Sequence, residues 1–328
     1  MRTKLRHEKC SRLRRLSNVL QRPPASKRKP MTLVIGMMAG SKNAPIPNDP
    51  DISSILLCAD TLASYVAPSA LALPLQVVTT SPYQSKIYPL PHGFVAGFCD
   101  DFAVSHHVAA VLHVCLEKLD PSEPAFRSEA RKAVVNAFKV TFQMFRPQYL
   151  ISWGVSEDEF LHDPQLDPAL KQELTTRLNE EWERMPAQLI VAGQTKNGPL
   201  LVNACPGGGM PWVRETTSYF AIGSPAESAL SWLRFRRQHN GFSVQRSCFH
   251  MFEAQQFCQS DPAVGRYLQA VLLQPNENPL HLKGRGTLLD TWRTEFGLRS
   301  TDKLDSGEYQ ASFETAFQIK LNEGSKNV

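Results

Sequence analysis

The fold class follows first from the stretch MTLVIGMMA, residues 31–39, and from ILLCAD, residues 55–60. Both are runs of β-branched and apolar residues of strand length, a pattern that predicts two buried strands. The segment between them, SKNAPIPNDPDISS (41–54), is rich in Pro, Asn, Asp and Ser, which disfavours regular structure. We therefore expect a hairpin with an enlarged loop at the start of the fold.

Further along the chain, strands and helices are expected in separate blocks. Two more strands, near 85–90 and 93–98, precede two helices, which begin at Asp100 or Asp101 and at about Ser128. A second block follows the same order, with strands at 187–193, 199–205 and 219–223 and helices from Ser224 to about Arg237 and over roughly 243–258. The stretch YLQAVLL (267–273) fits a strand or a helix. Blocks of strands followed by blocks of helices favour an α+β layered domain over an alternating parallel one.

Two of these helices carry signals at their ends. SPAE (224–227) is typical of a helix N-terminus, with Ser224 at the N-cap, Pro225 at the first helical position and Glu227 closing a capping box. Pro147 is expected to end the earlier helix at about Phe145.

The basic character of the chain is confined to its first thirty residues. Residues 1–30 carry eleven Lys and Arg against a single acid, Glu8, which leaves 25 basic and 30 acidic residues in 31–328. The remainder is therefore mildly acidic and offers no basic face, so a nucleic-acid-binding function would depend on this head alone. The head is Arg-rich and acid-poor, as an organellar transit peptide is. It fits equally well a propeptide, or a segment included because the start codon was assigned too early.

Cysteine usage and hydropathy bear on the compartment. The seven cysteines are odd in number, and most of them lie in apolar runs such as ILLCAD and VLHVCL. This pattern favours reduced, buried thiols and a cytoplasmic location over a disulfide framework. The apolar runs are shorter than the ~20 residues that a membrane-spanning helix needs. We therefore expect no membrane association.

The chain divides into a central domain with three additions. We expect a basic head at 1–31, a domain at 32–275 that contains an acidic insert at about 147–186, and a weakly patterned C-terminal extension at 276–328.

Several short motifs in the central domain, in this order, resemble those of a proteasome-type subunit of the N-terminal-nucleophile (Ntn) hydrolase superfamily. TLVIG (32–36) resembles the opening strand of that family, and LLCAD (56–60), SKI (85–87), FVAGF (94–98), LIVAGQTKNGPLL (189–201) and AIGS (221–224) resemble later ones. The resemblance implies a four-layer αββα sandwich of two antiparallel sheets. It also implies a set of catalytic residues: Thr32, Asp60, Lys86, Gly97, Ser224 and Asp261.

The resemblance gives each of these residues a role. Thr32 would be an N-terminal nucleophile whose own α-amino group, with a reference pKa of about 7.7–8.0, serves as the base. Lys86 would keep that amine neutral, and Asp60 would hold Lys86 in place. The N–H of Gly97 would stabilise the oxyanion, a contact typically worth about 3 kcal/mol. Ser224 and Asp261 would complete the hydrogen-bond network, and the reaction needs neither a metal nor a cofactor.

Each residue also has a structural explanation that the sequence leaves open. Thr32 fits a strand for its branched side chain alone, and Lys86 and Asp60 fit a strand edge and a strand end. Gly97 could ease a bend. Ser224 is explained as an N-cap, and Asp261 as a turn residue before Pro262.

The sequence departs from the family pattern at two positions near the proposed site. Met31 stands where the family usually has a glycine before the threonine, which favours initiation at Met31 and removal of that methionine over autolysis. If residues 1–31 are retained, Thr32 has no free amine and the site is inactive. Val264 stands where the family usually has a hydroxyl. The loops on either side of Asp60 are also longer than in the family.

The predicted function is that of a threonine-type amide hydrolase, a peptidase acting on peptide or amide substrates in a ring-like homo-oligomer. Whether an unfoldase ATPase is a partner does not follow from the sequence. The alternatives are a non-catalytic ring or scaffold subunit with the same fold, an acylase for small amides, and a nucleic-acid binder acting through the basic head.

Overall fold

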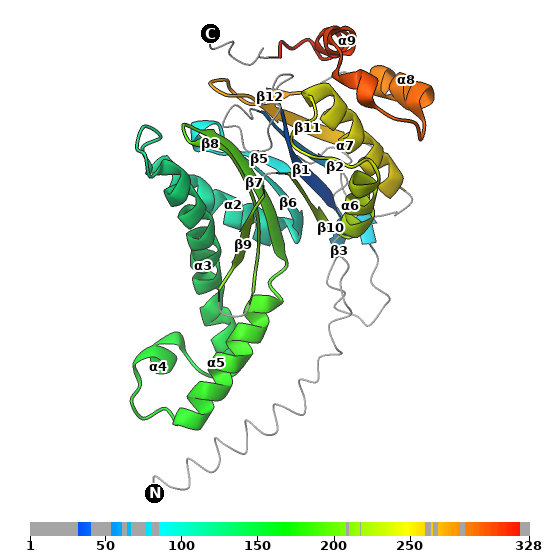
Figure 1. Cartoon of the computed structure of the whole chain (residues 1–328). Coiled ribbons are helices and arrows are strands. Elements are labelled where there is room, and N and C mark those ends of the chain that lie inside the picture. Colours follow the sequence, from blue (N-terminus) through cyan, green and yellow to red (C-terminus); the bar gives the residue numbers. More distant parts are fainter. Residues whose placement is uncertain are drawn as a thin grey trace, which may run out of the picture.

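The computed structural model describes residues 32–40, 54–60, 64–66, 77–79, 85–207, 210–216, 218–259, 264, 268–282 and 286–321. Within this part of the chain, two five-stranded sheets face each other (Figure 1). The first sheet has the order β10-β1-β2-β11-β12 and consists of β1 (Leu33–Ala39), β2 (Ser54–Asp60), β10 (Tyr219–Gly223), β11 (Leu268–Leu273) and β12 (Leu280–His281). All of its strand pairs are antiparallel.

The second sheet is antiparallel throughout and has the order β5-β6-β7-β8-β9. It consists of β5 (Ile87–Pro89), β6 (Val95–Asp100), β7 (Ala187–Thr195), β8 (Gly198–Cys205) and β9 (Trp212–Glu215). A short 3₁₀ turn, η1 (Pro91–Gly93), joins β5 to β6, and β3 (Ser64–Val66) pairs separately with β4 (Val77–Thr79).

The position of β1 between a sheet and a helical layer explains why its sequence is apolar without alternation. Every residue of β1 is buried. Val34 and Met38 point into the core between the two sheets, whereas Leu33, Ile35 and Met37 point to the outer face of the first sheet. A strand that is covered on both faces needs apolar residues at every position.

Helices cover the outer face of each sheet (Figure 1). The helices α2 (Phe102–Glu117) and α3 (Phe126–Ser152) pack on the second sheet, and α6 (Ala226–Phe235) and α7 (Val244–Cys258) pack on the first. The layers are therefore helix, sheet, sheet, helix. This arrangement confirms the predicted α+β class and the four-layer sandwich of two antiparallel sheets.

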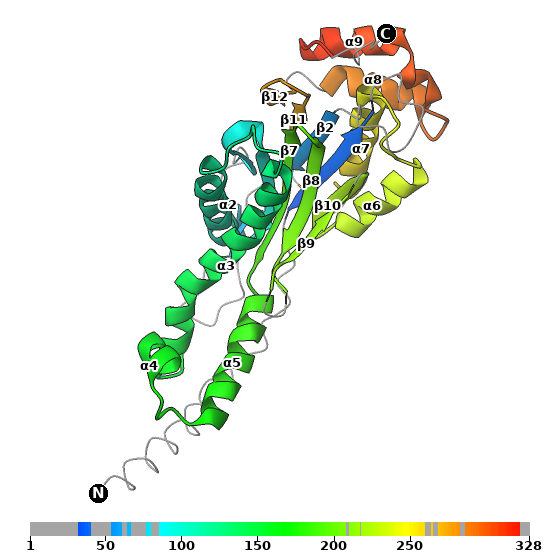
Figure 2. The ribbon, with the colours of Figure 1, turned by 60° about the vertical axis from the view of Figure 1, so that its left-hand side comes forward.

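The acidic insert forms a helical lobe that extends beyond the sheets (Figure 2). It contains the end of α3, α4 (Glu157–His162) and α5 (Pro168–Glu183), which share a small core of Leu150, Val155, Phe160, Leu174 and Leu178. The expectation that Pro147 ends the preceding helix is wrong, because α3 continues through it to Ser152. Packing against α5, including a Phe142–Trp182 ring contact at 4.2 Å, offsets the cost of a proline inside a helix.

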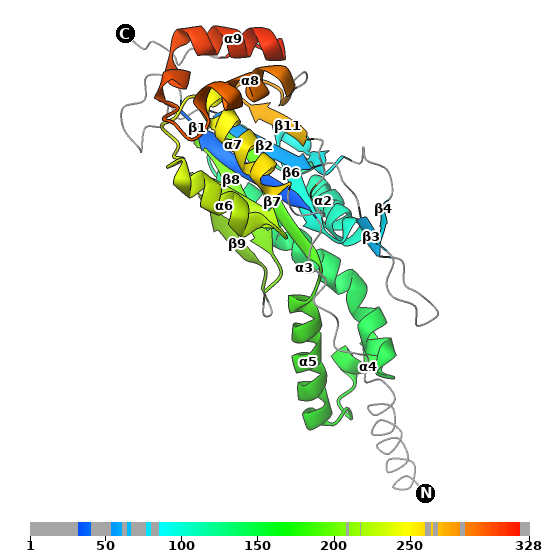
Figure 3. The same cartoon turned by 90° about the vertical axis from the view of Figure 1, so that its right-hand side faces the viewer.

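The C-terminal extension is also folded, although its sequence is weakly patterned. It contains α8 (Gly286–Phe296), η2 (Asp302–Asp305) and α9 (Gly307–Phe317), which lie over α7 at the end of the molecule away from the lobe (Figure 3). Trp292, Phe296 and Phe313 are buried in the same core as Phe249 of α7. A few large aromatic side chains thus hold a segment whose hydrophobic pattern is too sparse to predict helices.

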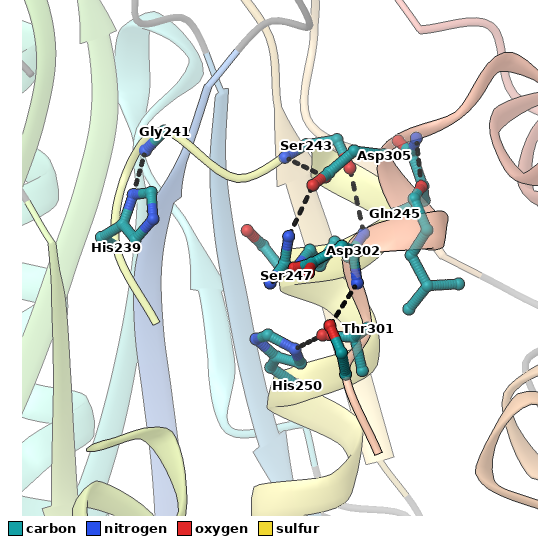
Figure 4. A network of polar contacts seen from close by, with 12 residues as sticks. His239, Gly241, Ser243, Gln245, Ser247, His250, Thr301, Asp302 and Asp305 are labelled. Atoms are coloured by element: carbon teal, nitrogen blue, oxygen red, sulfur yellow. Dashed lines mark hydrogen bonds and ion pairs between the residues drawn. The ribbon is translucent and has the colours of Figure 1, made fainter. Parts of the chain in front are cut away.

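Polar contacts strengthen this attachment (Figure 4). The backbone N–H of Ser243 donates to Asp305, and the Gln245 amide donates to the carbonyl of Leu304. His250 contacts the hydroxyl of Thr301 at 2.7 Å. The extension is therefore joined to α7 by buried hydrogen bonds as well as by apolar packing.

Candidate active site

Strand pairing brings Thr32 and Asp60 together at one end of the first sheet. Thr32 directly precedes β1 and Asp60 is the last residue of β2. Because β1 and β2 are antiparallel, with Val34 opposite Ala59, the start of one strand lies beside the end of the other. Lys86 directly precedes β5 in the second sheet and reaches this position from the opposite side.

The three side chains form one hydrogen-bonded cluster. Lys86 Nζ donates to Thr32 Oγ1 at 2.7 Å and to Asp60 Oδ1 at 3.1 Å. The same Asp60 oxygen accepts from the backbone N–H of Leu33 at 2.9 Å. Relative exposure is 5% for Thr32, 3% for Lys86 and 0% for Asp60. The cluster is thus shielded from bulk water, where electrostatic interactions are strong.

Burial sets the electrostatics of the cluster. Loss of hydration lowers the pKa of the Lys86 ammonium, and the neighbouring Asp60 carboxylate opposes that shift without cancelling it. A lysine with a lowered pKa exchanges protons more readily near neutral pH than a solvated one. The arrangement therefore joins a hydroxyl to a group suited to proton transfer.

The backbone of Lys86 is held from two sides. Its N–H donates to the side-chain Oε1 of Gln269 in β11 at 3.1 Å, and its carbonyl accepts from the N–H of Phe98 in β6 at 3.1 Å. Sequence reasoning missed Gln269, because a contact between residues 183 positions apart leaves no local pattern.

Gly97 lies in β6, opposite Ile87 of β5 and Ile190 of β7. A Cβ at this position would lie 2.6 Å from Val34 Cγ1, so close packing of the two sheets already requires glycine. The N–H of Phe98 donates to Lys86 on the β5 side, and alternation along the strand turns the N–H of the preceding Gly97 toward β7. The role of Gly97 as the oxyanion donor stays a prediction. It requires this N–H to donate to the oxyanion although it points toward the neighbouring strand β7.

Ser224 follows the strand that pairs with β1. Gly223 lies opposite Leu33, and its φ of +105° is one that side chains other than glycine's rarely allow. A Cβ there would lie 1.6 Å from the carbonyl oxygen of Thr32, so β10 approaches Thr32 as closely as a backbone can. The register thus places Ser224 beside Thr32, where its role in the hydrogen-bond network stays a prediction.

The expected capping role of Ser224 is wrong. Helix α6 begins at Ala226 with Pro225 at the N-cap, and no side chain caps it. The tight turn at Gly223 shifts the helix start by one residue. Asp261 lies outside the described residues, and Val264 is buried at 5% exposure.

The fold and this cluster define a layered α+β protein with a buried threonine, lysine and aspartate at one end of its sandwich. No protein-family model and no curated protein sequence match the chain. Among solved structures, the chain is similar to a Gly-1 mutant of Anbu from Hyphomicrobium sp. strain MC1, with 13% identity and a TM-score of 0.49 over 89% of this chain and 98% of that one. It is also similar to Anbu from the same strain, with 14% identity and a TM-score of 0.48 over 90% of this chain and 100% of that one.

The identification of the chain as a proteasome-type subunit is therefore wrong. Anbu belongs to a different proteasome-related family, and the likeness to it is a distant one in fold that carries no information about activity. The motifs behind the identification are mostly buried strand ends. A sandwich of this kind needs such segments whatever its family, so they indicate the fold and not the lineage.

The helices were also compared with the length and hydropathy of membrane-spanning segments. Within the described ranges, no helix combines the length and apolar character that crossing a membrane would take.

Proposed function

We propose that the protein is an amide-bond hydrolase with Thr32 as its nucleophile. One observation carries this proposal: Lys86 Nζ lies 2.7 Å from Thr32 Oγ1 inside a buried cluster that also contains Asp60. An ammonium that donates to a hydroxyl favours the deprotonated oxygen, so this contact prepares a weak oxygen nucleophile for a nearby base. A purely structural threonine at the start of a strand would need no buried ammonium beside it, since burying that charge is costly.

The reaction would proceed through an ester. Thr32 Oγ1 forms a bond to the amide carbonyl carbon while its proton passes to the base. When the carbon–nitrogen bond breaks, the base returns a proton to the leaving nitrogen, and the acyl group stays on Thr32. Water then attacks the ester in the same way and releases the acid and the free hydroxyl.

The base in this scheme is the α-amino group of Thr32, which exists only when the preceding peptide bond is absent. Lys86 holds Oγ1, and its charge disfavours a second positive charge on that amine, which keeps the amine able to accept a proton. Asp60 fixes Lys86 and also binds the N–H of Leu33, so it orients both sides of the nucleophile.

The decisive experiment compares matched chains that differ only at Thr32 and its amine. The first chain begins at Thr32 after removal of a fusion partner, the second carries Thr32→Ala, and the third retains a residue before Thr32. Hydrolysis is measured on a panel of peptides and small acyl amides, and the ester is sought by intact mass after acid quenching. We expect activity and the acyl adduct in the first chain alone.

Four other results are informative. Equal activity with Thr32→Ala would contradict the proposal. Activity in the third chain would keep Thr32 and move the role of base to Lys86. No hydrolysis by any chain favours a non-catalytic scaffold, and cleavage of small acyl amides without peptides favours an acylase.

We also propose that the protein forms a homo-oligomer in the cytoplasm. On the outer helical layer Phe235 and Phe257 are exposed at 54% and 49%, with the Trp232 ring packed between them. Exposed aromatic groups of this size are typical of an interface. Cys99, Cys115, Cys205 and Cys248 are free thiols, which fits a reducing compartment. Light scattering after size-exclusion chromatography measures the mass of the oligomer, and we expect Phe257→Ser to lower that mass.

A further inference from the structure

Three strand ends of the second sheet lie at the same end of the sandwich as Thr32. Asp100 ends β6, Ala187 begins β7 opposite it, and Cys205 ends β8. Lys86 lies at this end too, since its backbone pairs with Phe98 of β6. Polar groups at this edge are therefore close to the proposed nucleophile.

Asp100 has an unusual backbone for a residue other than glycine. Its φ is +74°, in the left-handed region that aspartate tolerates and that is common at functional sites. Strand alternation alone would direct its side chain to α2, since Cys99 points between the sheets. The left-handed backbone instead lets the Asp100 carboxyl hydrogen-bond the side chain of Gln188.

Gln188 lies on the face that looks toward the first sheet. Its neighbour but one along β7, Ile190, belongs to the core between the sheets, and side chains two apart share a face. The Asp100 carboxyl is thereby drawn to the side of the sheet on which Thr32 and Lys86 lie. The neighbouring Asp101, in contrast, is exposed and caps α2 by accepting from the N–H of Val104.

Asn203 adds a second observation on the same face. It lies opposite Ile190 in β8 and two residues before Cys205. Its Oδ1 is buried and has no hydrogen-bond partner among the described residues. An acceptor buried without a donor is costly, and such atoms in native proteins call for an explanation.

The nearby cationic side chains are engaged elsewhere, so the Asp100 carboxyl and Asn203 Oδ1 outnumber the positive donors around them. Lys86 already binds Asp60 and Thr32, and Arg214, opposite Asn203 in β9, is exposed and lies over the Trp212 ring at 5.1 Å. Burial raises the pKa of the Cys205 thiol, Arg214 opposes that rise and Asp100 adds to it, so both charges act on this strand end. A bound group that supplies N–H donors and positive charge would satisfy both the carboxyl and the unpartnered amide oxygen.

We propose that Asp100 and Asn203 form a recognition site for a cationic group of the substrate, an ammonium or a guanidinium, beside Thr32. This inference rests on the proposed amide hydrolysis and names its substrate class as amides whose acyl part bears a basic side chain. Asp100 supplies the charge and Asn203 an oriented acceptor. Gln188 holds the carboxyl in position.

The site should strengthen as pH rises through the titration of Asp100. Burial raises the pKa of its carboxyl to about 6, against the hydrogen bonds from Cys99 and Gln188. The carboxyl is therefore ionised at neutral pH and increasingly neutral below pH 6. The charged or titratable groups near it are Cys99, Asp101 and Cys205, with Lys86 and Asp60 acting on the same Cys99 thiol and Arg214 on Cys205.

The first test measures binding without catalysis. The Thr32→Ala chain is titrated with Nα-acetyl-arginine amide and with Nα-acetyl-norleucine amide, by calorimetry or by ligand-observed NMR. We expect the arginine ligand to bind at least about tenfold more tightly, a preference lost with Asp100→Asn and reduced with Asn203→Leu. Asp101→Asn is the matched control and should retain the preference.

The outcomes separate this inference from the proposed function. Equal binding of the two ligands, or a preference that survives Asp100→Asn, overturns the recognition site even if amides are hydrolysed. A preference that follows Asp100 but accompanies no hydrolysis would uphold the cation site and refute the proposed reaction. Asn is at least as tolerant of a left-handed backbone as Asp, so Asp100→Asn should fold.

Discussion

Two ion pairs with similar burial lie in different layers of this protein, and they differ in what surrounds them. Lys86–Asp60 lies at the end of the sheets, and Arg236–Glu253 lies among the helices that cover the first sheet. Arg236 binds both carboxylate oxygens of Glu253 and the backbone carbonyls of Arg299 and Gly297. None of these partners is a hydroxyl or a thiol, which suits a structural role.

The Lys86 pair has a reactive partner instead. Its ammonium binds one carboxylate oxygen and the hydroxyl of Thr32. Both pairs cost desolvation energy, but only the lysine contacts an atom that can act as a nucleophile. The comparison teaches that burial of an ion pair does not mark a site, whereas the chemistry of its third partner does.

The largest expected effect is that of Lys86→Met on catalysis. In a chain beginning at Thr32, we expect kcat/KM to fall by about 100- to 10,000-fold, because Oγ1 loses its partner and Asp60 its counter-ion. Lys86→Arg serves as the control that keeps the charge. Steady-state kinetics on the best amide of the panel provides the measurement, and unchanged kinetics would place Lys86 among the structural ion pairs.

Arg236→Met should have the opposite profile. Removing one partner of a buried pair leaves Glu253 uncompensated, so we expect the free energy of unfolding to fall by about 3–5 kcal/mol. Activity per folded molecule should be retained. Urea unfolding and active-site titration together measure both quantities, with Arg236→Lys expected to lose less. A loss of activity at full stability would show that the two pairs are coupled.

His250 of α7 makes the stability of the helical layer on the first sheet sensitive to acid. Its Nδ1 faces Gln238 Oε1, which can only accept, so Nδ1 carries a proton, and in the neutral ring Nε2 accepts from the Thr301 hydroxyl. Burial, together with nearby Arg246 and Arg236, lowers the pKa of His250 to about 3. The folded state therefore takes up fewer protons than the unfolded state below pH 6.5, and stability falls as pH drops.

This gives a measurable pH difference. Between pH 7 and pH 5 the His250 contribution to the loss of unfolding free energy should be roughly 2 kcal/mol, at about 1.4 kcal/mol per pH unit below 6.5. His250→Gln keeps polar contacts without titrating, so its unfolding free energy should vary less over this range. Urea midpoints at the two pH values test this, and parallel curves for both proteins would refute it.

The smallest effect concerns Asp100 and has the reverse sign. Because its pKa is raised in the folded state, ionisation between about pH 4 and pH 6 costs stability. We expect Asp100→Asn to raise the unfolding free energy at pH 7.5 by about 1 kcal/mol and to have little effect below pH 4. Thermal unfolding at the two pH values measures it. A loss at pH 7.5 would indicate that the ionised carboxyl stabilises the fold.

The sequence predicted the layers of the fold better than its boundaries. Apolar runs such as MTLVIGMMA identify buried strands because a strand covered on both faces tolerates no polar position. Asp100 and Asp101 were alternatives for a helix cap, and the structure assigns that role to Asp101. The C-terminal helices escaped prediction, because they depend on a few aromatic contacts with Phe249, which lies far away in the sequence.

The candidate site was predictable only in part. Resemblance pointed to Thr32, Asp60 and Lys86, and these three side chains do meet, although their catalytic roles stay predictions. Gln269 could not have been found in this way, since its contact with Lys86 depends on how two sheets are stacked. Asp100 was hidden for a related reason, because its carboxyl is aimed by a backbone angle that no sequence pattern encodes.

The contact between Gly223 and the Thr32 carbonyl makes the position of the nucleophile depend on a residue that takes no part in the reaction. A methyl group at 223 would overlap that oxygen, so the backbone at Thr32 would have to move. A substitution in β10 could therefore silence the reaction while every acid, base and nucleophile is intact. A natural or engineered variant that keeps Thr32, Lys86 and Asp60 but replaces Gly223 would therefore have every catalytic side chain and a misplaced Thr32 hydroxyl.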